Sequence, residues 1–267
     1  DRRQGEKQAM IGLLSAFAVS LCITVLVVHY VRKRGHLLLD HDTSGPQKFH
    51  ARPVPRIGGV GIYVGLLVAA GTMAITSPDS PGRWAFALLA CGLPAFLAGL
   101  IEDVTKRVSP AKRAAATALS ALLAVWVLGA AITRTDIPGL EWLVSFAVGS
   151  TLLTVIAVAG VANSVNLIDG FNGLASMCVV IMLTALAYVA FQVEDHFVAT
   201  LALAGIGAVM GFFIWNFPAG LIFLGDGGAY FLGFYVAELS ILLLVRNGTV
   251  SPIFPLLVWV SRAACWR

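Results

Sequence analysis

Apolar residues occur along the chain in long blocks, not in short alternating stretches. Eight blocks approach the roughly 20 residues that a helix needs to cross a bilayer. They cover residues 9–31, 57–76, 84–101, 114–133, 142–161, 174–191, 197–215 and 228–245, and a ninth begins near Ile253. The alternating segments of membrane β-barrels are absent. The pattern predicts an all-α, polytopic helical membrane protein with about eight or nine transmembrane helices, forming one domain over residues 1–267.

The composition agrees with this prediction. The chain is 58% hydrophobic and 12% charged, and its mean hydropathy is +0.87. The five histidines show no metal-ligand spacing, so a zinc site is not expected. The basic residues are not accompanied by a pattern of stacking aromatics, so nucleic acid is not an expected partner.

Lys and Arg gather in two of the loops between the blocks. The loop at 32–56 carries six of them and the loop at 102–113 carries four, whereas the loops on the opposite side hold only Arg83, Arg134 and Arg246. Cytoplasmic loops of membrane proteins are enriched in these residues. We therefore expect both basic loops in the cytoplasm, although the N-terminal tail carries basic residues on the other side. Alternation then places 161–175 and 216–228 on the cytoplasmic side too.

The segment "VANSVNLIDGFNGLA" (161–175) brings polar residues between two apolar blocks. Four of them stand three residues apart: Asn163, Asn166, Asp169 and Asn172. Successive steps of three rotate around a helix, so all four cannot share one face, and two glycines weaken the helix further. We expect a broken or bent element that points polar groups into a pocket at the membrane surface. The alternative is a helix N-cap with satisfied Asn side chains.

Three other cytoplasmic segments carry candidate chemistry. In "GDGG" (225–228), the glycines beside Asp226 allow a phosphate or metal to approach closely, unless the segment is only a tight turn. The neighbouring carboxylates of Glu102 and Asp103 repel each other, and a divalent cation or a lysine would relieve this repulsion, although a solvated loop is the alternative. In "RPVPRIGGVG" (52–61), Arg56 suits a phosphate contact, but the basic residues there would also attract anionic lipid.

Together these segments place carboxylates, amides and cations at the level of the lipid head groups. Phosphoryl transfer depends on positioning and on charge neutralisation by Mg²⁺ and cationic side chains. The pattern favours phosphate chemistry at the inner membrane face over transport, because a transporter would use acids near the bilayer midplane. A transporter or flippase remains the alternative.

Four motifs resemble the polyprenyl-phosphate N-acetylhexosamine-1-phosphate transferase family: "KFHARPVPRIGG", "GLIEDVTKRVSPAKR", "NSVNLIDGFNGLA" and "NFPAGLIFLGDGGAYFLG". The likeness extends from about residue 40 to 255 and is greatest to the branch that initiates O-antigen or capsule synthesis (lipopolysaccharide and cell-wall biogenesis). It implies transfer of a sugar 1-phosphate from a UDP-N-acetylhexosamine to undecaprenyl phosphate, with release of UMP. The implied cofactor is Mg²⁺, with Mn²⁺ as a substitute. The implied location is the bacterial inner membrane, with the active site facing the cytoplasm. The sequence leaves the oligomeric state open, a homodimer included.

The resemblance also implies roles for individual residues. Asp226 corresponds to the family's metal-binding aspartate, and the catalytic set is Glu102, Asp103, Asp169 and Asp226. The implied substrate-binding residues are His50, Arg56, Lys112, Asn163, Asn166 and Asn216.

The chain departs from the family pattern in three ways. Glu102 replaces the first Asp of the acidic pair, and Asn172 replaces an Asp that many relatives have. The family also carries a later His-rich cytoplasmic loop thought to bind donor phosphates, and this chain ends before it. We therefore expect a truncated C-terminus, and a catalytically incomplete fragment is a further alternative.

Overall fold

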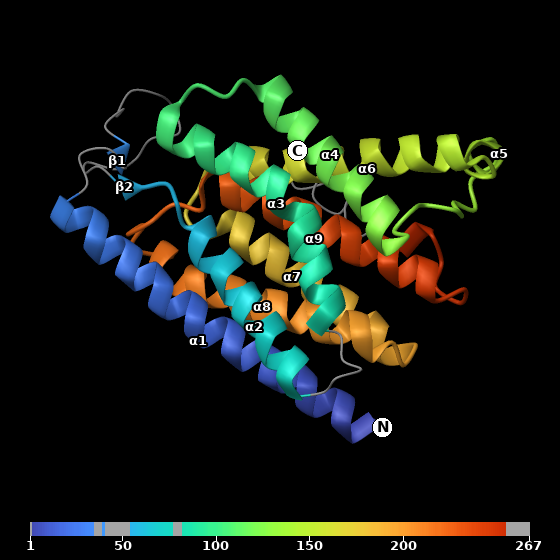
Figure 1. The fold of residues 1–267 in the computed structure, drawn as a ribbon, viewed down its shortest axis with the longest axis horizontal. Helices are drawn as coiled ribbons and strands as arrows, with labels where there is room; N and C mark the ends of the chain where they lie inside the picture. The colour runs from blue at the N-terminus through green and yellow to red at the C-terminus, as the bar shows by residue number, and fades with distance from the viewer. Residues whose placement is uncertain (1, 35–38, 41–53, 77–81, 255–267) are drawn as a thin grey trace.

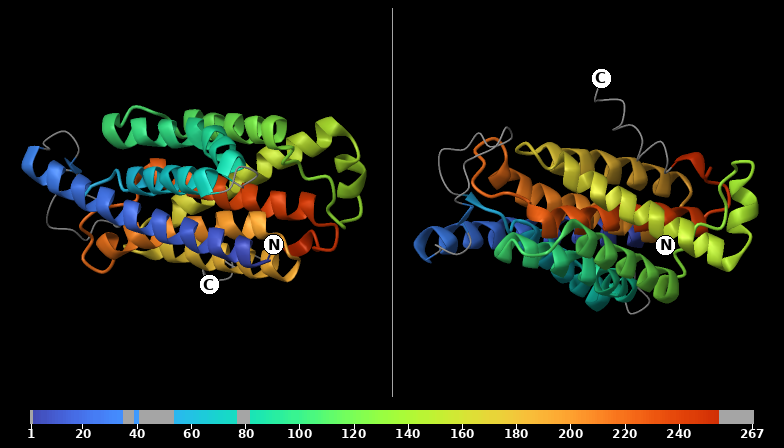
Figure 2. Two further views of the ribbon diagram at one scale, coloured as in Figure 1. Left: turned by 60° about the horizontal axis from the view of Figure 1, so that its bottom comes forward. Right: turned by 90° about the horizontal axis from the view of Figure 1, so that it is seen from above.

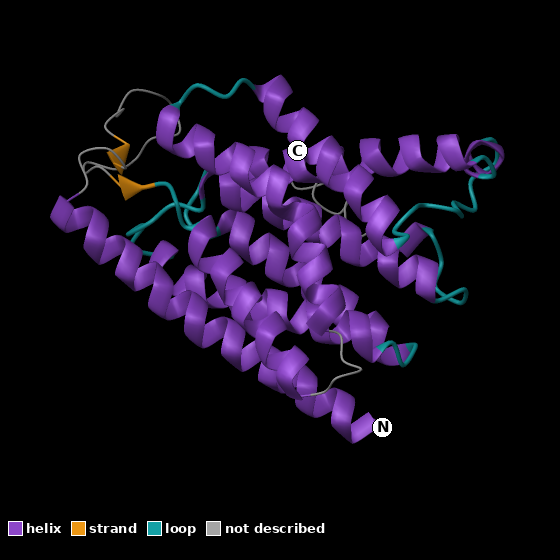
Figure 3. Cartoon of the chain, in the orientation of Figure 1, coloured by secondary structure: helices purple, strands orange, loops and turns teal. Residues whose placement is uncertain are grey.

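The computed structural model describes residues 2–34, 39–40, 54–76 and 82–254. Over these residues the chain forms helices joined by short loops (Figures 1 and 3). They are α1 (Arg2–Arg34), α2 (Gly59–Thr76), α3 (Gly82–Thr105), α4 (Pro110–Leu128), α5 (Leu140–Val144), α6 (Ala147–Ile168), α7 (Leu174–Gln192), α8 (His196–Asn216) and α9 (Gly225–Arg246). All except the short α5 are long and apolar enough to cross a membrane, which makes eight candidate spans in the described part of the chain.

The prediction of an all-α, polytopic membrane protein is confirmed. Helices suit a bilayer because they satisfy their backbone hydrogen bonds internally. Within the described residues, two short strands join them at one end of the bundle, β1 (Leu39–Asp40) and β2 (Val54–Pro55). They pair antiparallel, with Leu39 opposite Pro55. The predicted ninth span lies almost entirely outside the described residues.

Several predicted boundaries differ from the structure, and two of the differences bear on the site. α4 begins at Pro110 and not at 114, because the Ser109 hydroxyl accepts a hydrogen bond from the Lys112 amide and Pro110 suits a first helical position. α6 continues past 161 to Ile168. The expected broken or bent element in 161–175 is therefore present, but only in the second half of the segment. Asn163 and Asn166 lie on regular helix, and the break falls at 169–173.

Helix α9 is the centre of the bundle. It packs against α2, α3, α4, α6, α7 and α8, and every residue from Gly227 to Leu243 is buried. Helix α1 packs along α8 and α2 and lies on the outside of the bundle (Figures 1 and 2). This arrangement surrounds the N-terminal end of α9 with the ends of other helices.

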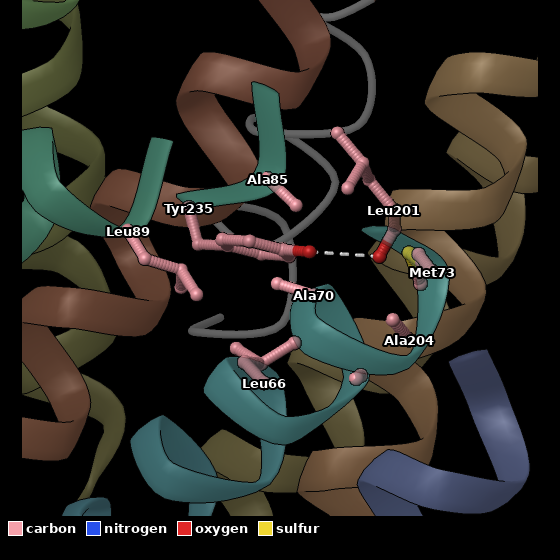
Figure 4. Close-up of a pocket in the computed structure, with 9 residues that line it drawn as sticks. Leu66, Ala70, Met73, Ala85, Leu89, Leu201, Ala204 and Tyr235 are labelled. Atoms are coloured by element: carbon pink, nitrogen blue, oxygen red, sulfur yellow. Dashed lines mark hydrogen bonds between the residues drawn. The ribbon is translucent and has the colours of Figure 1, made fainter. Parts of the chain in front are cut away.

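A pocket between α2, α3, α8 and α9 is an apolar packing gap (Figure 4). Its one polar side chain, that of Tyr235, donates its hydroxyl to the Leu201 carbonyl at 2.8 Å, as a buried tyrosine usually does. The lining residues are Leu66, Ala69, Ala70, Met73, Ala85, Leu89, Leu201, Ala204 and Tyr235. These groups offer no charge for a phosphate, so the candidate chemistry must lie elsewhere.

Polar segments that are distant in sequence meet at the end of the bundle where α9 begins, which we call the site end. The amides of Gly58 and Gly59 donate to the Phe223 and Leu224 carbonyls at 2.9 and 3.0 Å. The Phe223 amide donates in turn to the Pro55 carbonyl at 2.8 Å. These bonds fix the segment before α9 against the entrance to α2, beside the strands at the left of Figure 1.

Candidate active site

Asp103 joins the end of α3 to the beginning of α9. Its two carboxylate oxygens accept hydrogen bonds from the backbone amides of Asp226 and Gly227, each at 2.9 Å, and the residue is only 8% exposed. A carboxylate at a helix N-terminus satisfies free amides and interacts favourably with the helix dipole. Asp103 therefore determines where the first turn of α9, and with it Asp226, stands.

Glycine lets these two helix ends come together. Gly225 has φ +76°, a left-handed conformation that glycine adopts without strain. A Cβ atom on Gly225 would lie 2.6 Å from the nearer Asp103 carboxylate oxygen, and one on Gly99 would lie 2.5 Å from the Gly227 amide nitrogen. The "GDGG" segment is therefore the first turn of a helix that is packed against α3, and not an isolated tight turn.

Asp226 faces a cation. Its Oδ2 atom forms an ion pair with the Arg113 guanidinium, and the two side chains are 13% and 14% exposed. The guanidinium carbon also lies 5.6 Å from the centroid of the Tyr230 ring, within the range of a cation–π contact. The Tyr230 hydroxyl donates to Asn163 Oδ1 at 3.4 Å. Side chains of α4, α6 and α9 thus form one polar row.

Asp169 ends α6 close to the same point. Burial raises the pKa of its carboxyl to about 8, against the opposing effects of the Arg56 charge and a hydrogen bond from the Gly225 amide, while the nearby Asp103 charge adds to the rise. These interactions place Asp169 in one group with Arg56, Asp103 and the Gly225 amide. They also mean that Asp169 holds a proton near neutral pH in the protein alone.

Asn216 supports the site from below the surface. Its Oδ1 atom accepts a hydrogen bond from the Gly173 amide at 2.6 Å, and its amide group donates to the Ile222 carbonyl at 2.8 Å. The side chain is buried, with 4% of its surface exposed. Asn216 therefore ties the turn after α6 to the segment before α9, so that Asp169 and Asp226 are positioned together.

The remaining predicted site residues are placed less centrally. Glu102 Oε2 accepts the Val108 amide at 2.6 Å and so shapes the loop between α3 and α4. Lys112 and Asn163 are exposed and Asn166 is half-buried. His50 lies outside the described residues, so its predicted role has no structural account.

Sequence reasoning missed Arg113, because the hydropathy pattern of α4 does not show which of its faces is buried. Arg113 precedes the buried residues Thr117, Ser120 and Ala124 at spacings of four, seven and eleven, which lie on one helix face. Lys112 lies off that face. The cation that contacts Asp226 is thus the neighbour of the lysine that the resemblance suggested.

The acids at the site end do not form a closed metal site. Among the described residues, no group of three or more His, Cys, Asp or Glu side chains is placed to hold an ion. Mg²⁺ commonly binds through one or two carboxylates and completes its shell with water and substrate phosphates. Asp226 fits such a shared site, in which the donor's phosphates would supply further oxygen ligands.

The geometry therefore suits an anionic, phosphate-bearing ligand. Several polar groups converge on the N-terminus of one helix: cationic side chains, amides and a carboxylate able to share a divalent ion. A helix N-terminus itself favours anions. The site lies at one end of a bundle with eight helices long and apolar enough to cross a membrane, where a lipid head group would lie.

Comparison with known proteins agrees with this chemistry. The model of the family described as Glycosyl transferase family 4 matches residues 85–244. A probable undecaprenyl-phosphate N-acetylglucosaminyl 1-phosphate transferase of Bacillus subtilis (strain 168) is 29% identical over 94% of this chain and 69% of the relative. Phospho-N-acetylmuramoyl-pentapeptide-transferases of Bacillus thuringiensis (strain Al Hakam) and Bacillus cytotoxicus are 32% and 30% identical over 85% of this chain and 73% of each relative. The resemblance is confirmed: this multi-pass membrane protein belongs to glycosyl transferase family 4.

Proposed function

We propose that the protein transfers an N-acetylhexosamine 1-phosphate from a UDP-sugar to undecaprenyl phosphate, with release of UMP, as the first step of a cell-surface polysaccharide. The observation that carries this proposal is the convergence of Asp103, Asp169 and Asp226 with Arg113 and Arg56 around the beginning of α9. The printed functions of the relatives support the substrate classes.

The net reaction exchanges one phosphoanhydride (P–O–P) linkage for another. A bond forms between an oxygen of the lipid phosphate and the phosphorus attached to the sugar. The bond from that phosphorus to the oxygen of UMP breaks, and its electron pair leaves with UMP. Because both reactants are anions, the site must above all neutralise and orient phosphates.

The residues of the chain divide this work by position. Arg56 and Arg113 provide charge for the phosphates, and Arg can bind them in a bidentate manner. Asp226 would hold Mg²⁺, which when bound neutralises charge on the phosphate oxygens. Asp103 acts as a positioning residue for Asp226 through the α9 amides. Asp169 is available to exchange a proton with the lipid phosphate, and Asn163 and Asn166 would face the nucleotide side.

We further propose that the site end lies on the cytoplasmic side of the bacterial inner membrane. The support is the count of Lys and Arg: ten in the two loops at the site end against three in the opposite loops. UDP-sugars are cytosolic solutes, so this orientation would bring the donor to Asp226 without crossing the membrane.

The test is UMP release by the purified chain with undecaprenyl phosphate, Mg²⁺ and a panel of UDP-N-acetylhexosamines. We expect lipid-dependent UMP with at least one donor, and loss of it in Asp226→Asn. Asp136→Asn is the matched control, because Asp136 is an exposed acid on the opposite side of the bundle. Absence of UMP with every donor, also after fusion to the C-terminal segment of a relative, would contradict the proposal.

A further inference from the structure

We propose that Arg113 is an internal counter-ion, which occupies Asp226 in the empty site and moves to the phosphates when the donor binds. This inference rests on the proposed function, since it assigns a second partner to the same site. It makes Arg113 and the divalent ion competitors for one carboxylate until the donor arrives.

The first support is the burial of the pair. Arg113 and Asp226 are in contact, and both side chains are at least 86% removed from solvent. A carboxylate in such surroundings is costly without a cation. Asp226 has this need in particular, because the Asp103 carboxylate lies at the same helix end.

The second support is that the guanidinium has spare binding capacity. Its Nε–H group is buried and has no hydrogen-bond partner among the described residues. A guanidinium offers five donors in a planar fork, and an ion pair through one terminal nitrogen uses only part of it. An unpartnered buried donor beside Asp226 is suited to a ligand that brings several oxygen acceptors, such as a diphosphate.

The third support is a contact that would persist during the movement. The guanidinium already lies over the ring of Tyr230, one helical turn after Asp226 on α9. The Tyr230 hydroxyl is held by Asn163 on α6. Arg113 can therefore rotate away from Asp226 while it remains on the ring, so the movement does not require the charge to be fully buried alone.

The charge balance gives the direction of the effect. A divalent ion that binds at Asp226 without a donor must displace Arg113 or share one carboxylate with it, and both are unfavourable. A donor diphosphate supplies the anionic oxygens that both cations need. We therefore expect weak binding of the ion alone and mutual strengthening of ion and donor.

The experiment measures Mn²⁺ binding by electron paramagnetic resonance, with and without UDP as the diphosphate probe, in the purified full chain. Arg113→Ala is expected to bind Mn²⁺ alone about tenfold more tightly than wild type. It is also expected to bind UDP in the presence of Mn²⁺ about tenfold more weakly. The two affinities are expected to change in opposite directions, whereas damage to the fold would weaken the binding of both Mn²⁺ and UDP. Arg113→Gln, which can still hydrogen bond to Asp226 without charge, is a second variant in case Ala perturbs folding.

Arg107→Ala is the matched control. Arg107 is an exposed cation in the loop before α4, so its removal lowers the net charge equally, and we expect less than about a twofold change. Unchanged or weaker Mn²⁺ binding in both Arg113 variants would overturn the proposed counter-ion role of Arg113. Unchanged UDP binding would overturn its proposed movement to the donor phosphates. If Asp226→Asn retains the Mn²⁺ site, the proposed metal role fails instead, which separates the two failures.

Discussion

Asp103→Asn is the substitution that most directly tests how the site is assembled. In the native protein each carboxylate oxygen accepts one amide, from Asp226 and from Gly227, at 2.9 Å. Asparagine has the same shape but only one oxygen. Its –NH₂ group would face the second backbone N–H, so one amide at the beginning of α9 would lose its acceptor.

The expected cost follows from these contacts. A hydrogen bond to a charged group contributes about 1.5–3 kcal/mol, and a negative charge at a helix N-terminus adds about 0.3–1 kcal/mol. Because Asp103 is only 8% exposed, water cannot replace the lost acceptor. We expect the free energy of unfolding to fall by about 2–4 kcal/mol, measured by denaturant titration of the purified protein in detergent.

Glu102→Gln is the control, because it removes the same charge from the neighbouring residue. Glu102 accepts a single amide, that of Val108, and glutamine retains one oxygen for that bond. We expect this variant to lose less than about 1 kcal/mol. Equal stability of the two variants would refute the reasoning that Asp103 acts through two amides of α9.

Three further predictions concern other ionisable groups. Glu238 is fully buried and both of its carboxyl oxygens lack partners among the described residues. Glu238→Leu should therefore leave the free energy of unfolding unchanged or raise it by about 1–3 kcal/mol, whereas Glu238→Gln should give no gain. A loss of stability in Glu238→Leu would show that the carboxyl has a role. Burial raises the pKa of Asp169 to about 8 from about 3.9 in the unfolded chain, so the substrate-free protein should lose stability as pH rises between about 5 and 8. Asp169→Asn should reduce the dependence of the free energy of unfolding on pH in this range. An unchanged dependence would contradict the prediction. Asp195 accepts hydrogen bonds from Arg246 and Asn247 at 2.8 Å and caps α8. Asp195→Ala should therefore lower the free energy of unfolding by about 2–3 kcal/mol, measured by thermal or denaturant unfolding. Glu194→Gln, at the exposed neighbour, is the control, and an equal loss in both variants would argue against a stabilising role for the Asp195 contacts.

Within the site, the sequence predicted which segments matter more reliably than what each residue contacts. The acids Asp103, Asp169 and Asp226 were selected from their setting beside apolar helix ends, and the structure brings all three to the beginning of α9. The partner of Asp226 was not predicted, because the choice between Lys112 and Arg113 depends on which face of α4 turns inward.

The spacing of polar residues also did not predict how far the helix break after α6 extends. Asn163, Asn166 and Asp169 recur at a spacing that suggested a distorted segment, yet α6 stays regular to Ile168. Regular helix is retained because Asn side chains at the membrane surface can point outward or contact a neighbour, as Asn163 contacts Tyr230. The turn ends at Gly173, whose amide donates to the Asn216 side chain, a contact made across 43 residues.

The sequence by itself determined the membrane class, the eight spans and the family, because apolar blocks of bilayer length and local motifs are properties of neighbouring residues. Only the tertiary structure decided that α9 is the buried centre, that Asp103 caps it, and that Arg113 neutralises Asp226. These relationships arise from packing among helices that are distant in the chain. In a uniformly apolar set of helices, the hydropathy pattern does not specify which faces meet. The pairing of faces is specified by complementary small residues and buried charges, which interact only when the helices are assembled.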